Sequence, residues 1–316
     1  MNPAIELQSV CKSYGNNHAV KNLDLTIPTG SLCGFLGPNG AGKSTTIRMI
    51  MSIIHPDSGS INVLGTKALH AKDRIGYLPE ERGIYRKMKV GAYIQYIANL
   101  KGLRGAPLKK QINDWLERIE LPEVQHKKCE ELSKGMQQKV QFLASIIHNP
   151  ELIILDEPFT GLDPVNAKVI GKIIDELRQE GKTILFSTHV LPQAEQICNR
   201  IVMIDQGTKV LDGTIESIRE QFDPRLIQVE PVDHNADFSQ IKGISNTTPV
   251  DKDGKVYLRL EEQAIPSEIL QAVVTTAPVL GAQLVKPTLD EIFIEQVAQR
   301  RGTQAAEKAR EDFANA

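Results

Sequence analysis

The spacing of apolar residues changes along the chain and separates strand-forming from helix-forming parts. Short apolar runs broken by turns over residues 5–27 predict an antiparallel strand pair that leads into a strand at 32–36. Between residues 90 and 147 the apolar positions recur at helical spacing, which predicts a separate helical lobe. Aliphatic strand patterns then return at 152–155, 183–187 and 201–204, with helical patterns at 165–180 and 191–198 between them. This alternation is typical of an α/β fold whose buried sheet is mainly parallel.

A shift in composition after residue 222 indicates a second, smaller domain. Strand patterns near 226–229, 256–260 and 279–285 mix with helical patterns near 267–274 and 289–298, as in a small α+β domain. We therefore expect a main domain over 1–222 with its helical lobe at about 85–149, an accessory domain over 223–298, and a flexible or helical tail over 299–316.

Charge and cysteine content narrow the class of protein. The chain has 316 residues and a formal net charge of -2, so no overall field would attract it to nucleic acid. Its four cysteines show no CxxC spacing, which disfavours a zinc site or a disulfide framework and fits a reducing compartment. No window approaches the roughly 18 apolar residues that a membrane span needs, and the N-terminus has no export signal. We expect a cytoplasmic protein that neither crosses a membrane nor binds nucleic acid.

The loop after the strand at 32–36 carries the strongest chemical signal. It satisfies the GxxxxGK[ST] pattern through Gly37, Pro38, Asn39, Gly40, Ala41, Gly42, Lys43, Ser44 and Thr45. Glycines let successive N–H groups point into one concavity, and the following helix adds the positive end of its dipole, so such a loop binds phosphates. We expect Lys43 to reach the β- and γ-phosphates and Ser44 to ligate Mg²⁺. The alternative is a glycine-rich turn that binds nothing.

Two adjacent carboxylates follow the strand at 152–155. Ligands of such sheets bind at the carboxyl ends of the strands, which places Asp156 to hold the Mg²⁺ shell through water and Glu157 to polarise an attacking water. Adjacent carboxylates at a strand end are usually only a solvated turn, but here a phosphate loop precedes them. His189 ends the next strand and is either a structural histidine or a sensor of the γ-phosphate. Tyr14, before a turn glycine, either packs on the surface or stacks on a base.

A second anion site is predicted at residues 132–136, where a helix of the lobe begins. The hydroxyl of Ser133 and the backbone N–H groups of the first helical turn can bind an anion, but this lobe has no phosphate of its own. Taken alone, Ser133 is an ordinary helix cap. If a second copy of the chain faced the first, each helix start could instead cap the γ-phosphate that the other copy holds.

These motifs resemble those of the nucleotide-binding subunits of ATP-binding cassette (ABC) transporters, over roughly residues 5–222. In order they are the adenine-stacking aromatic Tyr14, the phosphate loop at 37–45, the Q-loop position Glu80, the signature at 132–136, the carboxylates Asp156 and Glu157, the D-loop at 161–163 and the switch histidine His189. The resemblance implies a P-loop NTPase fold of the RecA-like type, with a mixed sheet, an N-terminal antiparallel β part and the helical lobe.

The resemblance also implies the roles of the site residues. ATP and Mg²⁺ are the expected cofactors. The expected catalytic residues are Glu157, His189 and Lys43, the expected metal site is Ser44, Asp156 and Glu80, and Ser133 and Gly135 are expected to bind ATP in trans.

Two motifs depart from the family pattern. Glu80 stands where the Q-loop normally has glutamine, and a carboxylate there would add negative charge and a stronger Mg²⁺ ligand. In the signature, Lys134 and Met136 replace a glycine and a glutamine, and Lys134 could add positive charge near the trans phosphates. Together with the run from Pro287 to Phe293, this pattern resembles export-type cassettes that include sodium and drug extruders.

The resemblance implies an ATPase that energises export of an unknown substrate through a separate, polytopic membrane permease. It would act as a homodimer, or as a dimer with a paralogous cassette, on the cytoplasmic face of the cell membrane. The alternative is a soluble ABC ATPase acting on ribosomes or DNA, but such relatives carry two cassettes or a long coiled-coil insertion, and this sequence has neither. A phosphate-loop kinase or GTPase is disfavoured because neither would need the Ser133 helix start or Asp163.

Overall fold

The computed structural model describes residues 3–81, 83–222, 225–251, 253–261, 263–302 and 304–307. Contacts divide the chain into two compact units, and the division falls between Thr214 and Ile215. It lies earlier than the boundary at residue 222 expected from composition. The short helix α8 (Ile215–Glu220) therefore groups with the second unit.

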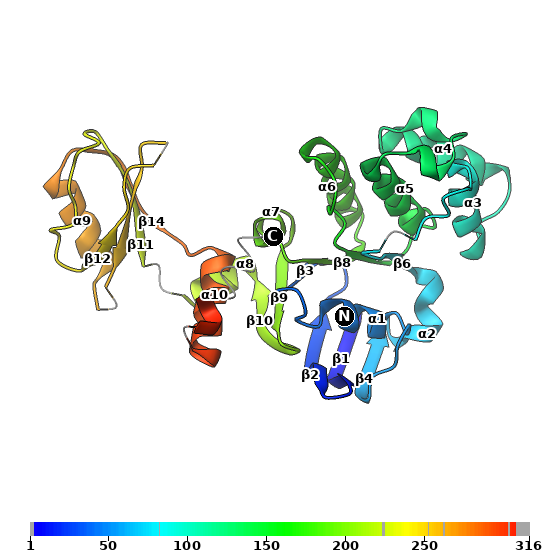
Figure 1. The fold of residues 1–316 in the computed structure, drawn as a ribbon, viewed down its shortest axis with the longest axis horizontal. Helices are drawn as coiled ribbons and strands as arrows, with labels where there is room; N and C mark the ends of the chain where they lie inside the picture. The colour runs from blue at the N-terminus through cyan, green and yellow to red at the C-terminus, as the bar shows by residue number, and fades with distance from the viewer. Residues whose placement is uncertain are drawn as a thin grey trace. The chain divides into compact units, whose positions relative to one another are not determined.

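The first unit is built on a central sheet with the strand order β10-β9-β3-β8-β7-β6 (Figure 1). Its strands are β3 (Leu32–Leu36), β6 (Ile75–Leu78), β7 (Leu152–Asp156), β8 (Thr183–Thr188), β9 (Arg200–Asp205) and β10 (Thr208–Thr214). Neighbouring strands from β9 to β6 are parallel, and β10 alone runs antiparallel, as a hairpin with β9. All residues of β3, β7 and β8 are buried, as in sheets covered on both faces. The predicted α/β fold is confirmed.

A second sheet of the first unit is antiparallel and includes the predicted strand pair. It has the order β2-β1-β4-β5, with β1 (Ile5–Tyr14), β2 (Asn17–Ile27), β4 (Ser58–Val63) and β5 (Thr66–Lys67). Ile5 of this sheet and Phe35 of the central sheet belong to one buried core, which also holds Ile47 and Ile50 of α1 (Lys43–Ile50). The helix that follows the phosphate loop is thus fixed by a core common to both sheets.

The helical lobe consists of α3 (Val90–Leu100), α4 (Ala106–Arg118) and α5 (Lys134–Ile146), and α5 packs beside β6 (Figure 1). Polar contacts join the lobe to the rest of the unit. The ammonium of Lys101 donates to the Ile75 carbonyl at 3.1 Å, and Arg118 forms an ion pair of 2.7 Å with Glu176. The unit also contains the α-helices α2 (Ala68–Ala71), α6 (Pro164–Gln179) and α7 (Leu191–Ile197).

The second unit is an antiparallel sheet with helices, as predicted for a small α+β domain. The strands β11 (Leu226–Pro231), β12 (Ile244–Thr247), β13 (Val256–Leu260) and β14 (Val279–Val285) take the order β12-β13-β11-β14. Val273 of α9 (Pro266–Thr276) shares a core with Ile227 and Leu258 of the sheet. The last long helix, α10 (Leu289–Arg301), continues past the expected end at residue 298. Among the described residues, none of the helices is both long and apolar enough to cross a bilayer.

The candidate nucleotide site

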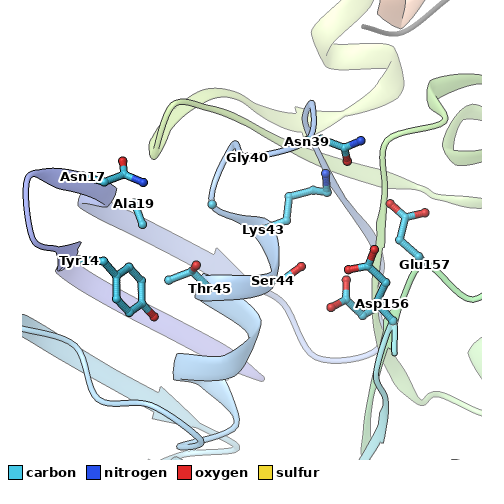
Figure 2. Close-up of a pocket in the computed structure, with 12 residues that line it drawn as sticks. Tyr14, Asn17, Ala19, Asn39, Gly40, Lys43, Ser44, Thr45, Asp156 and Glu157 are labelled. Atoms are coloured by element: carbon cyan, nitrogen blue, oxygen red, sulfur yellow. The ribbon is translucent and has the colours of Figure 1, made fainter. Parts of the chain in front are cut away.

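A pocket of about 310 Å³ lies where the phosphate loop meets the carboxyl ends of the central strands. It is lined by Tyr14, Asn17, Ala19, Asn39, Gly40, Gly42, Lys43, Ser44, Thr45, Glu80, Asp156 and Glu157. Figure 2 shows Lys43 and Ser44 facing Asp156 and Glu157, while Tyr14, Asn17 and Ala19 lie toward the other end of the pocket. Its volume is in the range of small-ligand sites.

Two glycines of the phosphate loop are required by close backbone contacts. Gly37 has φ +151°, and a Cβ there would lie 2.2 Å from the carbonyl oxygen of Ile204. Gly42 has φ +105°, and its Cβ would lie 2.4 Å from the carbonyl oxygen of Ala19. These contacts hold the loop against β9 and β2, so any larger residue would displace it.

The side chain of Lys43 is buried inside the loop. Its ammonium donates to the carbonyl of Gly37 at 2.6 Å and to that of Pro38 at 3.2 Å. Burial lowers the pKa of Lys43, and the carboxylates of Glu157, Asp156 and Glu80 oppose that shift. A cation held beside the pocket in this way is ready to bind a phosphate anion.

Asp156, the last residue of β7, is 2 % exposed. Its carboxylate accepts a hydrogen bond from the hydroxyl of Ser187 on the neighbouring strand β8. Burial raises the pKa of Asp156, and the charges of Glu80 and Glu157 add to the rise, whereas Ser187 and Lys43 oppose it. A nearby cation would therefore favour the ionised form of this carboxyl group.

Glu157 follows β7 in a left-handed backbone conformation with φ 51°, which is uncommon for a residue with a side chain. Its Oε1 accepts from the backbone N–H of His189 at 3.0 Å and lies 2.6 Å from the ring Nδ1 of the same residue. Its Oε2 accepts from the hydroxyl of Thr188 at 3.2 Å. Three groups at the end of β8 thus fix the carboxylate of Glu157 at the pocket. His189 itself is not among the pocket-lining residues.

The other end of the pocket is formed by the β1–β2 strand pair. The ring of Tyr14 is 51 % exposed, and the ammonium of Lys12 lies 5.6 Å from its centroid. Lys12 is held by an ion pair of 2.7 Å with Asp57. An exposed aromatic ring with one face toward a cation leaves the other face available for stacking.

The predicted signature segment lies outside the pocket lining. Ser133 is the N-cap of α5, and its hydroxyl accepts from the N–H of Met136 at 3.2 Å. Farther along the same helix, the amide of Gln138 donates to the carbonyl of Pro158 at 3.2 Å. Because Pro158 follows Glu157, the helix start is tied to the segment that carries the carboxylate.

The Q-loop position is tied to the same helix. Glu80 follows β6, is exposed and lines the pocket. The amide of Gln141 on α5 donates to the carbonyl of Glu81 at 3.4 Å. The loop that carries Glu80 therefore joins the helical lobe to the nucleotide pocket.

The structure brings most of the predicted residues together in one pocket. Those outside its lining are Gly37, Pro38, Ala41, His189, Ser133 and Gly135. The sequence pattern predicted no role for Asn17 and Ala19, which line the pocket, or for Ser187 and Thr188, which hold the two carboxylates. Two hydroxyls at the end of the strand next to the one that carries the carboxylates are the signal that could have identified the last two.

Comparisons with known proteins identify the family of the chain. Residues 20–160 match the ABC transporter family, and residues 213–297 match the C-terminal domain of DrrA1-3-like ATP-binding proteins. The uncharacterized ABC transporter ATP-binding protein YhaQ of Bacillus subtilis (strain 168) is 38% identical over 294 residues, which cover 93% of this chain and 98% of that protein. The Nod factor export ATP-binding protein I of Sinorhizobium fredii (strain NBRC 101917 / NGR234) is 36% identical, over 72% of this chain and 67% of that protein.

A solved structure supports the same assignment. The ATP-binding subunit of an ABC transporter superposes with a TM-score of 0.65 and is 29% identical, over 69% of this chain and 93% of that chain. Nearly the whole chain matches ABC transporter ATP-binding proteins, and this match identifies its family. The chain belongs to the ATP-binding proteins of the ABC transporters: it is an ATPase that resembles the export-type members and has a DrrA-like C-terminal domain.

Proposed function

We propose that this ATPase energises the export of a substrate through a separate, membrane-spanning permease, and that it works as a head-to-tail dimer on the cytoplasmic face of the membrane. In such a dimer two ATP molecules lie between the phosphate loop of one subunit and the signature helix of the other. ATP binding closes the dimer and hydrolysis reopens it.

The observation that supports a dimer is that two anion-binding features of one chain lie apart from each other. The phosphate loop opens onto the pocket, whereas Ser133 and Gly135 do not line it. Ser133 is exposed and starts α5, a helix long enough to present N–H groups and a dipole to an anion. A second copy of the chain would supply this helix start to the γ-phosphate, so each site would be completed in trans.

Glu157 is the proposed general base. Its carboxylate is held by Thr188 and His189 at the end of β8, so it can accept a proton from a water aligned with the γ-phosphate. Lys43 would neutralise charge on the transferring phosphoryl group once its ammonium leaves the loop carbonyls. His189 keeps Glu157 in place, a role consistent with its contact with the carboxylate.

The donor set of the pocket fits Mg²⁺. The hydroxyl of Ser44 and the carboxylates of Glu80 and Asp156 line it together, and oxygen is the donor that Mg²⁺ prefers. Within the described residues, no group of three or more His, Cys, Asp or Glu side chains could hold a metal ion by itself, so phosphate oxygens and water would complete the shell. When bound, the ion would neutralise phosphate charge.

Two similarities support transport in the export direction. ATP-binding subunits of ABC transporters work with membrane permease components, and a relative that covers most of this chain is named for Nod factor export. Neither similarity identifies the substrate, because the substrate path would lie in the permease.

The direct test is affinity purification of the tagged chain from detergent-solubilised membranes of its host, with mass spectrometry of the co-purified proteins. We expect a polytopic membrane protein in stoichiometric amount, lost when membranes are first stripped of peripheral proteins with urea. Ribosomal proteins or DNA in place of that protein would contradict transport and support the soluble alternative.

A further inference from the structure

A two-residue turn that lies far from the phosphate loop in the sequence forms a backbone hydrogen bond with that loop. Gln206 and Gly207 connect β9 to β10, and both have left-handed backbones, with φ 46° and 79°. Tight hairpin turns with two left-handed residues favour glycine. Gly207 is buried, unlike most turn residues.

The peptide groups of Gly207 join the phosphate loop to β2, two segments that border the nucleotide pocket. Its N–H donates to the carbonyl of Ala41, inside the phosphate loop, at 2.9 Å. Its carbonyl accepts from the N–H of Lys21, on β2, at 2.9 Å. One residue thus holds both the loop expected to bind phosphates and the strand pair that carries Tyr14.

Close packing also joins the turn, the phosphate loop and β2. A Cβ at Gly207 would lie 2.7 Å from the carbonyl oxygen of Ala19, and a Cβ at Gly42 would lie 2.4 Å from that same oxygen. The carbonyl of Ala19 therefore packs between a glycine of the turn and a glycine of the loop. Side chains at either position would push β2 away from the phosphate loop.

We propose that Gly207 is a positioning residue of the ATP site, which holds the phosphate loop in register with the base-binding strand pair. The proposal rests on ATP binding in this pocket. It requires that a change at Gly207 weaken every ligand that uses the phosphate loop, whatever its base.

A second turn of the same type provides a matched control. Leu64 and Gly65 connect β4 to β5 with φ 51° and 78°, and a Cβ at Gly65 would have nothing within 4 Å. Gly65→Ala and Gly207→Ala thus impose the same backbone strain, and only Gly207→Ala also disturbs the loop.

The test measures the affinity of the full chain and the two variants for ATP, GTP and inorganic tripolyphosphate, each with Mg²⁺, by calorimetry. We expect Gly207→Ala to bind all three ligands about tenfold or more weakly, because small displacements of positioned groups are costly. Gly65→Ala should stay within about twofold of the parent, a difference below 0.5 kcal/mol. Parental affinity in Gly207→Ala, an equal loss in Gly65→Ala, or a loss confined to ATP would each overturn the proposal.

Amide hydrogen exchange of the unmodified chain keeps the proposal testable if Gly207→Ala fails to fold. Exchange of the Gly207 amide should slow when tripolyphosphate binds, since the bond to Ala41 tightens with the loop, and unchanged exchange would count against the proposal. A parent chain that binds none of the ligands would instead refute the ATP pocket, which is a distinguishable result.

Discussion

The ring of His189 contacts the carboxylate of Glu157, with 2.6 Å between Nδ1 and Oε1. The two residues follow neighbouring parallel strands, β8 and β7, and meet because those strands end at the same edge of the sheet. The backbone N–H of His189 donates to the same oxygen, so the pair is held by main chain as well as by side chain.

Removal of the imidazole should impair turnover more than binding. His189 does not line the pocket, and its contact is with the proposed base. In His189→Ala we expect kcat to fall about 10- to 100-fold while KM for ATP changes less than about threefold. Steady-state phosphate release measures both. His70→Ala, at an exposed position of α2, is the control and should match the parent; a large rise in KM with unchanged kcat would refute the positioning role.

Loss of the base itself should separate hydrolysis from binding. Glu157→Gln keeps the size of the side chain but cannot accept the proton of water, so we expect hydrolysis to fall at least about 100-fold with ATP affinity preserved. The variant should elute as a dimer in ATP and as a monomer without it. Glu151→Gln, at the other end of β7 with a 55 % exposed side chain, should behave like the parent. Parental turnover in Glu157→Gln would exclude the residue as the base.

Completion of each site in trans predicts complementation. In Gly135→Asp the new Cβ would make ordinary van der Waals contacts, the nearest with Leu162 Cδ2 at 3.5 Å, so the fold should hold while a carboxylate repels the γ-phosphate. We expect Gly135→Asp and Lys43→Ala each to lose at least about 90 % of activity, since each removes charge complementarity to phosphate. A mixture should regain activity, because the mixed dimer contains one site with Lys43 from one subunit and Gly135 from the other. A mixture no more active than its components would argue against sharing in trans.

Stacking on Tyr14 should be selective for the base. The aromatic ring is exposed at the pocket end, and base–aromatic stacking is worth about 1–3 kcal/mol. We expect Tyr14→Ala to weaken ATP binding about tenfold without changing tripolyphosphate binding, and Tyr14→Phe to bind like the parent. Calorimetry with both ligands measures the difference. An equal loss for tripolyphosphate would show that Tyr14 acts on the loop instead of the base.

A half-buried histidine, His148, should make the fold sensitive to mild acid. Burial lowers the pKa of His148 from 6.5 to about 4, with the charge of Lys101 adding to the effect. The unfolded chain takes up this proton below pH 6.5 while the folded chain does not, so stability is fully present above pH 6.5 and falls as the pH drops toward 4. We expect a loss of about 1–2 kcal/mol, less than the full linkage value because the ring is partly exposed.

Urea unfolding at pH 7 and pH 4.5 measures this loss. His148→Gln should reduce the pH dependence, since glutamine stays neutral and can still donate to the carbonyl of Ile75, which His148 now contacts at 3.1 Å. His55→Gln, at an exposed position, should leave the pH dependence unchanged. The same slope in the parent and in His148→Gln would contradict the assignment.

Much of the architecture was predictable because buried positions require apolar or small residues. The runs Leu152 to Leu155 and Thr183 to Ser187 are apolar or small throughout, as strands covered on both faces require, and β7 and β8 were confirmed there. The phosphate loop was equally readable, because its pattern combines backbone freedom, a cation and a hydroxyl at set positions.

Other features depend on contacts that no local pattern encodes. The helix α8 is too short to show a helical period, so its grouping with the second unit leaves no mark in the sequence pattern. The left-handed backbone of Glu157 and the bond from Gly207 to Ala41 follow from which strands become neighbours in the sheet.

The hydrogen bond from Gln138 to Pro158 would link the two nucleotide sites of the proposed dimer. It links α5, whose start would grip the ATP of the partner, to the segment that would cleave the subunit's own ATP. In the proposed dimer, cleavage on one side would therefore alter the hold on the nucleotide across the interface. The two nucleotide sites of the dimer would therefore be coupled through α5.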